Sequence, residues 1–407
     1  MLQGFKIIAS SALILAIAAC AAPPIKKEQV VFYPSPPDLP RVQYLTSFSG
    51  SRDVEAQTAF EKFVVGQNKD IKLDKPYGVA IYDGKIYVCD TNNTVIVFDF
   101  KGKKFRALPG AKGQGKLVEP LNISIEEDGT KYVTDPVRGQ VVVFDRDDLY
   151  VRTYGMPGNW KPIDAVVFGE YVYVSDMDNG RVDVFDKKTG ETVKTIGDKG
   201  EISQRLSRPT DLAFDKEGNL YVTDFARFQI VKFDRDGHFL STIGRLGDAL
   251  ANFVRPKGIA LDNESRLFAV DAAFNNVQVF NKAGALLMFV GGGTPQEAGS
   301  LVLPAQIVID YKNLKYFQQY VDPSFEADYL IIVTSQFGDH RVNLYAFGKE
   351  KGKKYPTDEE LNKTLQEKIK KELEKLKPAE NKEGRGQGET EEKAGNPAKP
   401  ADAPAVK

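Results

Sequence analysis

Apolar and β-branched residues recur in short runs along the chain, and Asp, Gly, Asn or Pro bound each run. Within a run, apolar and polar positions tend to alternate, which is typical of strands that bury one face. The segment 206–244, LSRPTDLAFDKEGNLYVTDFARFQIVKFDRDGHFLSTIG, contains four such runs. DKEG and DRDG within it are hairpin signals. This segment therefore predicts four short antiparallel strands.

The same pattern repeats through the middle of the chain. Each unit opens with a proline, and the prolines are Pro76, Pro120, Pro162, Pro209, Pro256 and Pro304. An aspartate ends the second apolar run of five units: Asp90, Asp135, Asp176, Asp224 and Asp271. Four strands are too few to bury both faces of a sheet, so units of this kind stack on one another. Radial stacking in a β-propeller is the predicted architecture.

The repeated residues resemble NHL repeats. Pro-x-Gly-Val/Ile-Ala at 76–80 and 256–260 is followed by Tyr-Val-x-Asp and Val-x-Phe-Asp patterns. The resemblance covers about residues 69–348 and implies an all-β fold, a six-bladed β-propeller of four-stranded antiparallel blades, which we expect to occupy 42–348. The last unit has an insertion, carries Ser335 in place of the aspartate and lacks a fourth strand. Residues 42–50, VQYLTSFSG, are similar to the outer strand of the fourth unit, so we expect this N-terminal strand to close the ring.

The N-terminus reads as an export signal. An apolar run from Ile7 to Ala19 follows Lys6, and it is too short to span a bilayer but suits a signal peptide. The sequence Ile-Ala-Ala-Cys that ends at Cys20 resembles the bacterial lipobox. This resemblance implies that the signal peptide 1–19 is removed and that Cys20 is lipidated. Ala21 stands where the family's inner-membrane retention signal has Asp, which favours the outer membrane, with the domain facing the periplasm or the surface.

The segments on either side of the predicted propeller differ in composition. Residues 20–41 are rich in proline and are expected to form an extended tether. Residues 349–378 predict a charged helix, because Thr357 precedes acidic residues and leucines recur at helical spacing before Pro378. Packing on its own domain and docking on a partner both fit this helix. Residues 379–407 are rich in Gly, Pro, Glu, Lys and Ala, and we expect disorder.

Composition excludes several classes of function. The 55 basic and 56 acidic residues leave a formal net charge of −1, which argues against a nucleic-acid partner. The two cysteines exclude a four-thiolate metal site. Cys89 lies within a predicted strand and is expected to be a buried, unpaired thiol. The oligomeric state is left open by the sequence.

Candidate chemistry gathers at one end of the predicted central channel. The residues two positions after the prolines include Asn122, Asp164, Asp211 and Gln306. A ring of carboxylates and amides could hold a polar ligand or a divalent cation such as calcium, or it could bond to backbone. The five repeated aspartates have a different explanation. A carboxylate that recurs once per blade is predicted to stabilise turns rather than to act in catalysis.

Two surface patches are candidate partner sites. Arginines and aromatics in the loops at the same end form a candidate binding face: Arg138, Arg181, Phe225, Arg227, Phe228 and Phe274. The insertion at 311–329 offers Tyr316, Phe317 and Tyr320 as a candidate patch for a protein or glycan partner. Its alternative role is an apolar cap on the other end of the propeller. The spacing of Leu314, Phe317 and Val321 predicts a short amphipathic helix.

The histidines bear on catalysis. Some six-bladed NHL enzymes, the amidating lyases, use several histidines on zinc, whereas this chain has only His238 and His340, predicted on opposite faces. No nucleophile elbow or phosphate loop is present, and no catalytic residue or cofactor is assigned. The preferred hypothesis is a non-catalytic, lipid-anchored module that binds or scaffolds another envelope protein, a polysaccharide or a small ligand. The alternative is a divalent-cation-dependent lyase or lactonase-like hydrolase with its site at the channel mouth.

Overall fold

The computed structural model describes residues 30–55, 70–92, 94–155 and 158–375. The chain divides into two units, 1–362 and 363–407, and the strands all belong to the first. The predicted signal peptide 1–19, the lipidation site Cys20 and the predicted disordered tail 379–407 lie outside the described residues. Among the described helices, none is long and apolar enough to cross a membrane.

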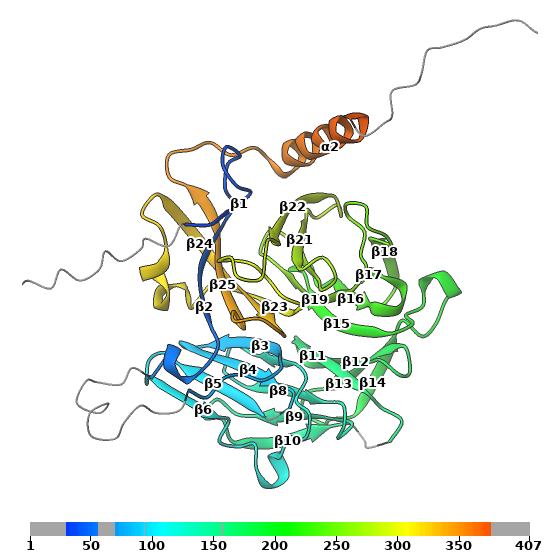
Figure 1. Ribbon diagram of the computed structural model, residues 1–407. Coiled ribbons are helices and arrows are strands. Elements are labelled where there is room, and N and C mark those ends of the chain that lie inside the picture. The colour runs from blue at the N-terminus through cyan, green and yellow to red at the C-terminus, as the bar shows by residue number, and fades with distance from the viewer. Residues whose placement is uncertain (1–29, 56–69, 93, 156–157, 376–407) are drawn as a thin grey trace, which may run out of the picture. The chain divides into compact units, whose positions relative to one another are not determined.

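Six antiparallel sheets form the blades of a β-propeller, which confirms the predicted fold class (Figure 1). The first strands of neighbouring blades contact one another around the ring, so they line its centre. Blade one is β3 (Pro76–Tyr82), β4 (Lys85–Asp90), β5 (Val95–Asp99) and β6 (Lys104–Ala107); blade two is β7 (Ile123–Ile125), β8 (Lys131–Asp135), β9 (Gln140–Phe144) and β10 (Tyr150–Tyr154). Blade three is β11 (Pro162–Phe168), β12 (Tyr171–Asp176), β13 (Arg181–Asp186) and β14 (Thr192–Ile196); blade four is β15 (Pro209–Phe214), β16 (Leu220–Asp224), β17 (Gln229–Phe233) and β18 (Phe239–Ile243). Blade five is β19 (Pro256–Leu261), β20 (Leu267–Asp271), β21 (Asn276–Phe280) and β22 (Leu286–Gly291).

Blade six joins the two ends of the propeller sequence. It contains β23 (Pro304–Asp310), β24 (Phe325–Ser335), β25 (Val342–Glu350) and the N-terminal β2 (Val42–Phe48). β2 pairs antiparallel with β25, which confirms the predicted closure. A two-residue strand, β1 (Phe32–Tyr33), pairs with the outer edge of β2. The described part of the predicted tether therefore packs on the propeller instead of standing free, and the Tyr33 hydroxyl donates to the Gly299 carbonyl at 2.8 Å.

We call the face that carries the loops entering the first strands the top face, and the opposite face the bottom face. At the top face, the repeated aspartates tie each entering loop to its own blade. Asp90 accepts hydrogen bonds from the backbone N–H groups of Asp74 and Lys75 at 2.8 and 2.7 Å. The equivalent bonds recur at Asp135, Asp176, Asp224 and Asp271. Ser335 accepts the corresponding bond from Val302 in blade six at 3.2 Å. These contacts confirm the structural role predicted for the repeated aspartates.

The core lies between neighbouring blades, where the apolar faces of two sheets meet. Cys89 is fully buried between blades one and two and is unpaired, as predicted. Burial is the main cause that raises the pKa of its thiol, so this cysteine is a small core residue.

The blade-six insertion differs from its prediction. Two short 3-10 turns, Leu314–Tyr316 and Gln318–Tyr320, stand where an amphipathic helix was expected. The chain bends at Phe317 so that its ring enters the core, 1% exposed, against Phe48 and Phe100. Phe317 therefore cannot belong to a surface patch, and it acts instead as part of the apolar cap on the bottom face. Tyr316 is half-buried, and Tyr320 alone of the three is exposed.

The C-terminal helix α2 (Asp358–Lys375) begins later than 349, because β25 continues to Glu350. Thr357 caps it: its hydroxyl accepts from the Glu360 N–H at 3.3 Å, and the Glu360 carboxylate accepts from the Thr357 N–H at 2.9 Å. Asp358 pairs with Arg266 of blade five at 2.9 Å. The first turn of α2 is thus fastened to the propeller unit.

Candidate functional site

The predicted channel residues do converge. The Asn122 amide donates to Asp164 at 2.7 Å and to Asp211 at 3.1 Å, and the Gln306 amide donates to Asp211 at 2.7 Å. All four side chains are buried. We call Asn122, Asp164, Asp211 and Gln306 the central network. Asp164, Asp211 and Gln306 lie in the first strands of their blades, and Asn122 lies directly before the first strand of its blade. The four residues belong to four different blades, so only the closed ring brings them together.

Two glycines make room for the central network. A Cβ on Gly78 would lie 2.6 Å from the Asn122 side chain, and a Cβ on Gly258 would lie 2.0 Å from the Gln306 side chain. Real Cβ atoms do not approach other heavy atoms so closely. Gly78 and Gly258 occupy the equivalent position in their own blades, so the amides of the next blades fill the space that they leave.

The donors around the central network do not suit a cation. Asp164 also accepts from the Leu212 N–H at 3.0 Å, and Asp211 from the Ile259 N–H at 2.7 Å. Backbone N–H groups hold the amide oxygens of Asn122 and Gln306, so their NH₂ groups face the carboxylates. Each carboxylate oxygen therefore accepts an N–H, and a divalent ion would have to displace these donors.

Burial dominates the electrostatics of the central network. It raises the pKa of Asp164 to about 7, against the opposing effect of the hydrogen bonds. Burial, followed by the nearby charge of Asp164, also raises the pKa of Asp211. Near neutral pH these carboxyl groups are thus poised to carry less than their full negative charge.

A cavity of about 450 Å³ opens at the top face above this end of the channel; we call it the top cavity. The side chains that matter most for its chemistry are Lys75, Tyr77, Glu119, Arg255, Lys257 and Gln336. Burial, with the charges of Asp211 and Asp164, raises the pKa of the Tyr77 phenol. This electrostatic effect links the top cavity to the central network.

Lys257 is the most unusual residue of the top cavity. It is only 8% exposed, and its Nζ donates to the neutral Gln336 Oε1 at 2.8 Å. The Nζ also lies 5.1 Å from the centre of the Tyr77 ring. In the described part of the chain, no carboxylate lies within ion-pair distance of it. Burial, followed by the charges of Arg255 and Lys75, lowers the pKa of Lys257 to about 7.

Lys75 and Arg255 add positive charge to the same cavity. Both are exposed, and neither forms an ion pair through its side chain with any described residue. Lys75, Arg255 and Lys257 line the same cavity, and the charges of the first two lower the pKa of the third. Glu119, half-buried, supplies a carboxylate to the lining. The top cavity therefore presents an excess of positive charge that no described carboxylate neutralises through an ion pair.

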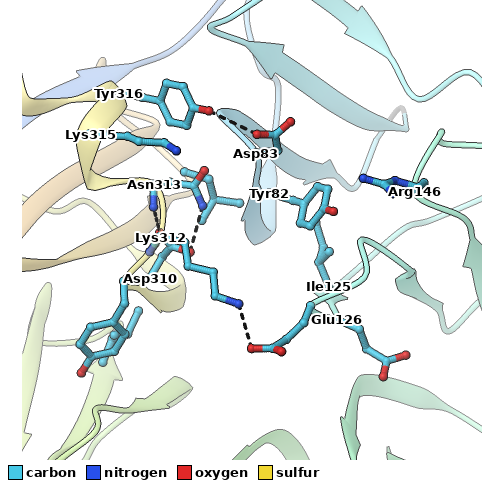
Figure 2. A pocket seen from close by; sticks show the side chains of 14 residues that line it. Tyr82, Asp83, Ile125, Glu126, Arg146, Asp310, Lys312, Asn313, Lys315 and Tyr316 are labelled. Atoms are coloured by element: carbon cyan, nitrogen blue, oxygen red, sulfur yellow. Dashed lines mark hydrogen bonds and ion pairs between the residues drawn. The ribbon is translucent and has the colours of Figure 1, made fainter.

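A second cavity, of about 550 Å³, opens at the bottom face between the insertion and blades one and two; we call it the bottom cavity (Figure 2). Several of its polar side chains have partners among the described residues. Lys312 pairs with Glu127 at 2.8 Å, and Tyr316 donates to Asp83 at 3.2 Å. Asp310 accepts from the backbone and side chain of Asn313 at 2.6 and 3.0 Å. These bonds brace the insertion against neighbouring blades, so we interpret the bottom cavity as structural.

The predicted binding face does not form one free surface. The guanidinium groups of Arg138 and Arg227 donate to carbonyls of the loops that enter their own blades, and Arg181 pairs with Asp183 at 2.8 Å. Phe225 lines the top cavity. Phe228 and Phe274 are half-buried. Arg138 and Arg227 thus stabilise loops and Arg181 pairs within β13, which leaves Phe225 as the member that lies at the candidate site.

The two histidines are bound locally. His238 contacts Asp234 at 2.9 Å in the β17–β18 hairpin on the bottom face, and His340 contacts Ser47 at 2.6 Å before β25. Asp234, Asp236 and His238 bring their ligand atoms within 4.8 Å of one another, but the group is largely exposed. This group lies in the hairpin between the two outer strands of blade four, whereas the central network lies on the first strands.

Lys257 was not among the predicted site residues, although its place in the repeat distinguishes it. The residues directly after the six repeat prolines are Tyr77, Leu121, Ile163, Thr210, Lys257 and Ala305. Lys257 is the only charged residue of this set. All of these residues except Ala305 line the top cavity, and Lys257 is the one that brings a charge to this position.

Comparison with known proteins supports the fold. Residues 161–257 match a family described as a 6-bladed beta-propeller. A probable peptidyl-alpha-hydroxyglycine alpha-amidating lyase of Caenorhabditis elegans is 30% identical over 106 residues, which cover 25% of this chain and 30% of that protein. The chain thus matches less than a third of that relative's length.

Two solved structures share the architecture. One is a protein of unknown function from Bacteroides thetaiotaomicron, with a TM-score of 0.52 and 17% identity over 75% of each chain. The other is a gluconolactonase of Xanthomonas campestris, with a TM-score of 0.50 and 14% identity, covering 78% of this chain and 97% of that one. At these identities the likeness concerns the fold alone.

Proposed function

We propose that this protein is a lipid-anchored propeller of the bacterial cell envelope that binds a small organic anion in the top cavity. The observation that carries the proposal is the convergence of Lys75, Arg255 and Lys257 without a carboxylate partner within ion-pair distance among the described residues. Uncompensated cations in a concave site attract anions, and desolvation strengthens that attraction. A cavity of about 450 Å³ suits a small molecule rather than a protein surface.

The ligand is proposed to be a carboxylate. Arg255 can hold one through two parallel N–H bonds, and Lys75 can add a point charge. Tyr77 and Phe225 supply aromatic walls, and Gln336 supplies a neutral polar group. This mixture of a few polar groups and apolar walls is typical of small-molecule sites.

Calorimetry with L-lactate tests this proposal. We expect wild-type protein to bind lactate, and the double variant Lys75→Ala with Arg255→Ala to bind it at least about tenfold more weakly, because two charged contacts are removed. Lys312→Ala, which removes a paired cation of the bottom cavity, is the matched control and should leave binding unchanged. Equal binding by all three proteins, or no binding by wild type, would overturn the proposal.

Anchoring is proposed from the lipobox-like sequence before Cys20, with the outer membrane as the location. Cells grown with a clickable palmitate analogue should label the wild-type protein and fail to label Cys20→Ser. Density-gradient separation of the two membranes should place the labelled protein in the outer-membrane fraction. A label that persists in Cys20→Ser contradicts lipidation at this residue, and inner-membrane fractionation contradicts the location.

The catalytic alternative, a cation-dependent lyase or lactonase-like hydrolase, has support from the partial match to a probable amidating lyase. The central network offers it little, since N–H donors occupy the carboxylate oxygens there. Anion binding therefore remains the function that the geometry supports best.

A further inference from the structure

The top cavity contains a buried amine that anion binding alone does not explain. We propose that Lys257 is a nucleophile that condenses with the carbonyl group of a small 2-oxo acid to form an imine. This inference rests on the proposed function, because the same cavity must first hold the acid's carboxylate.

The placement of Lys257 is the first argument. Its Nζ has one described hydrogen-bond partner, the neutral Gln336, and it faces a cavity rather than a packed core. Burying a cation without a carboxylate is costly. The equivalent positions of the other blades carry uncharged residues, so the blade does not need a lysine there to fold. A costly group that packing does not require is a candidate for chemistry.

The surroundings favour the reactive form of the amine. A lysine attacks a carbonyl only when it is neutral, and a buried lysine beside other cations loses its proton more readily. Arg255 and Lys75 provide these cations, and the pKa of Lys257 is lowered to about 7. Tyr77 and Glu119 are the other titratable groups of the cavity. A solvated lysine would be neutral in only about one molecule in several thousand at pH 7.

The same two cations define the class of carbonyl compound. Arg255 and Lys75 would hold a carboxylate beside the amine, and in a 2-oxo acid the carbonyl carbon is bonded directly to the carboxylate carbon. A neutral aldehyde would lack this second contact. The geometry thus favours 2-oxo acids over uncharged carbonyl compounds.

The condensation balances without an oxidant or reductant. The Nζ lone pair forms a bond to the carbonyl carbon, and the electron pair of the C=O bond moves to oxygen. A proton passes from nitrogen to that oxygen, which gives a carbinolamine. This hydroxyl then leaves as water with the remaining N–H proton, and the nitrogen electron pair forms the C=N bond of the imine. One amine and one 2-oxo acid yield one imine and one water.

Reductive trapping tests the inference. The full-length protein is incubated at pH 7 with pyruvate and sodium cyanoborohydride, which reduces an imine to a stable secondary amine, and modified lysines are located by peptide mass spectrometry. We expect Lys257 to be modified at least about tenfold faster than the exposed Lys312, because far more of it is neutral. L-lactate, which has the carboxylate but no carbonyl, should slow the modification of Lys257 and leave that of Lys312 unchanged.

Controls separate the inference from the proposed function. Lys257→Met should abolish the adduct, and its folding is checked by its circular dichroism spectrum. Lactate and pyruvate binding without an adduct at Lys257 would overturn the imine and leave anion binding intact. Neither binding nor an adduct would overturn both. An adduct that lactate does not slow would support a reactive amine but contradict the carboxylate site.

Discussion

Two buried lysines lie on opposite faces of the propeller and have opposite surroundings. Lys131, at the start of β8 on the bottom face, is fully buried and pairs with Asp148 at 2.9 Å. Its Nζ also donates to the carbonyls of Gly129, Asp145 and Arg146. Lys257, on the top face, has the neutral Gln336 as its described hydrogen-bond partner.

Some charged groups of the two cavities differ in the same way. Lys312 and Asp310 at the bottom cavity are satisfied by other parts of the protein, whereas Lys75 and Arg255 at the top cavity have no described ion-pair partners. A buried charge with complete partners contributes to the structure. A buried charge that the described residues leave uncompensated points to a ligand. The predictions below test this distinction.

The largest effect is expected from Lys131→Met. Removing one partner of a buried pair leaves Asp148 with Arg106 and the Tyr87 hydroxyl alone. Losses of this kind amount to about 3–5 kcal/mol, and we expect the lower end because Arg106 remains. Urea denaturation at pH 7 measures the change. A loss below about 1 kcal/mol would contradict the assignment of Lys131 as a structural lysine.

A smaller effect is expected for the pH dependence of the central network. The pKa of Asp164 is raised from 3.8 to about 7, so the folded state binds more protons than the unfolded state in this window. Its contribution to stability is fully present below about pH 4 and is lost as the pH rises through about 7.

The variant Asp164→Asn has no carboxyl group at this position, so it should lose less stability than wild type as the pH rises. We expect the stability of wild type, relative to the variant, to fall between pH 4 and pH 8. The variant should be less stable at pH 4, because an amide donor would face the Asn122 donor. Urea denaturation across this pH range measures how the free energy of unfolding depends on pH. Parallel curves of this free energy for the two proteins would show that burial does not raise the pKa of the Asp164 carboxyl.

Lys257→Met should have a smaller effect, of opposite sign to that of Lys131→Met. Replacing an unpaired buried cation with an apolar side chain of similar length is expected to be neutral or to stabilise the protein by about 1 kcal/mol at pH 7. The pKa of Lys257 is lowered, so its folded state binds fewer protons, and wild type should recover relative to the variant as the pH rises above about 7. Destabilisation comparable to that of Lys131→Met would remove the contrast between the two lysines.

The smallest effect is expected on adding calcium. N–H donors already occupy the carboxylate oxygens of Asp164 and Asp211, so millimolar calcium should leave the melting temperature of wild type unchanged. Thermal melts with and without a chelator measure this. A clear upward shift that Asp211→Asn abolishes would place a cation at the central network after all.

Much of the fold could be predicted from local patterns. The prolines and aspartates recur once per blade because each blade needs the same entering loop and the same turn, as the bonds to Asp90 show. The closing strand was predictable because residues 42–50 repeat the pattern of an outer strand. The structure of the insertion could not be predicted in this way, because contacts with Phe48 and Phe100 from other parts of the chain place Phe317.

The candidate site was only partly predictable. The repeat register places Asn122, Asp164, Asp211 and Gln306 at the channel, but their mutual hydrogen bonds depend on Gly78 and Gly258 in neighbouring blades. Lys257 is the one charged residue among those that directly follow the six repeat prolines, but the sequence does not indicate which side chains contact it.

The sequence by itself determined the number of blades, their strand order and the closure of the ring, because these follow from periodic burial and local turn bonds. The tertiary structure decided which charges are compensated. Lys131 opens β8 and Lys257 is the second residue of β19. Asp148 of the same blade pairs with Lys131, whereas Gln336 of blade six accepts a hydrogen bond from Lys257 of blade five. The partner of Lys257 comes from the next blade and the central network joins four blades, so the candidate site was defined only once the ring had closed.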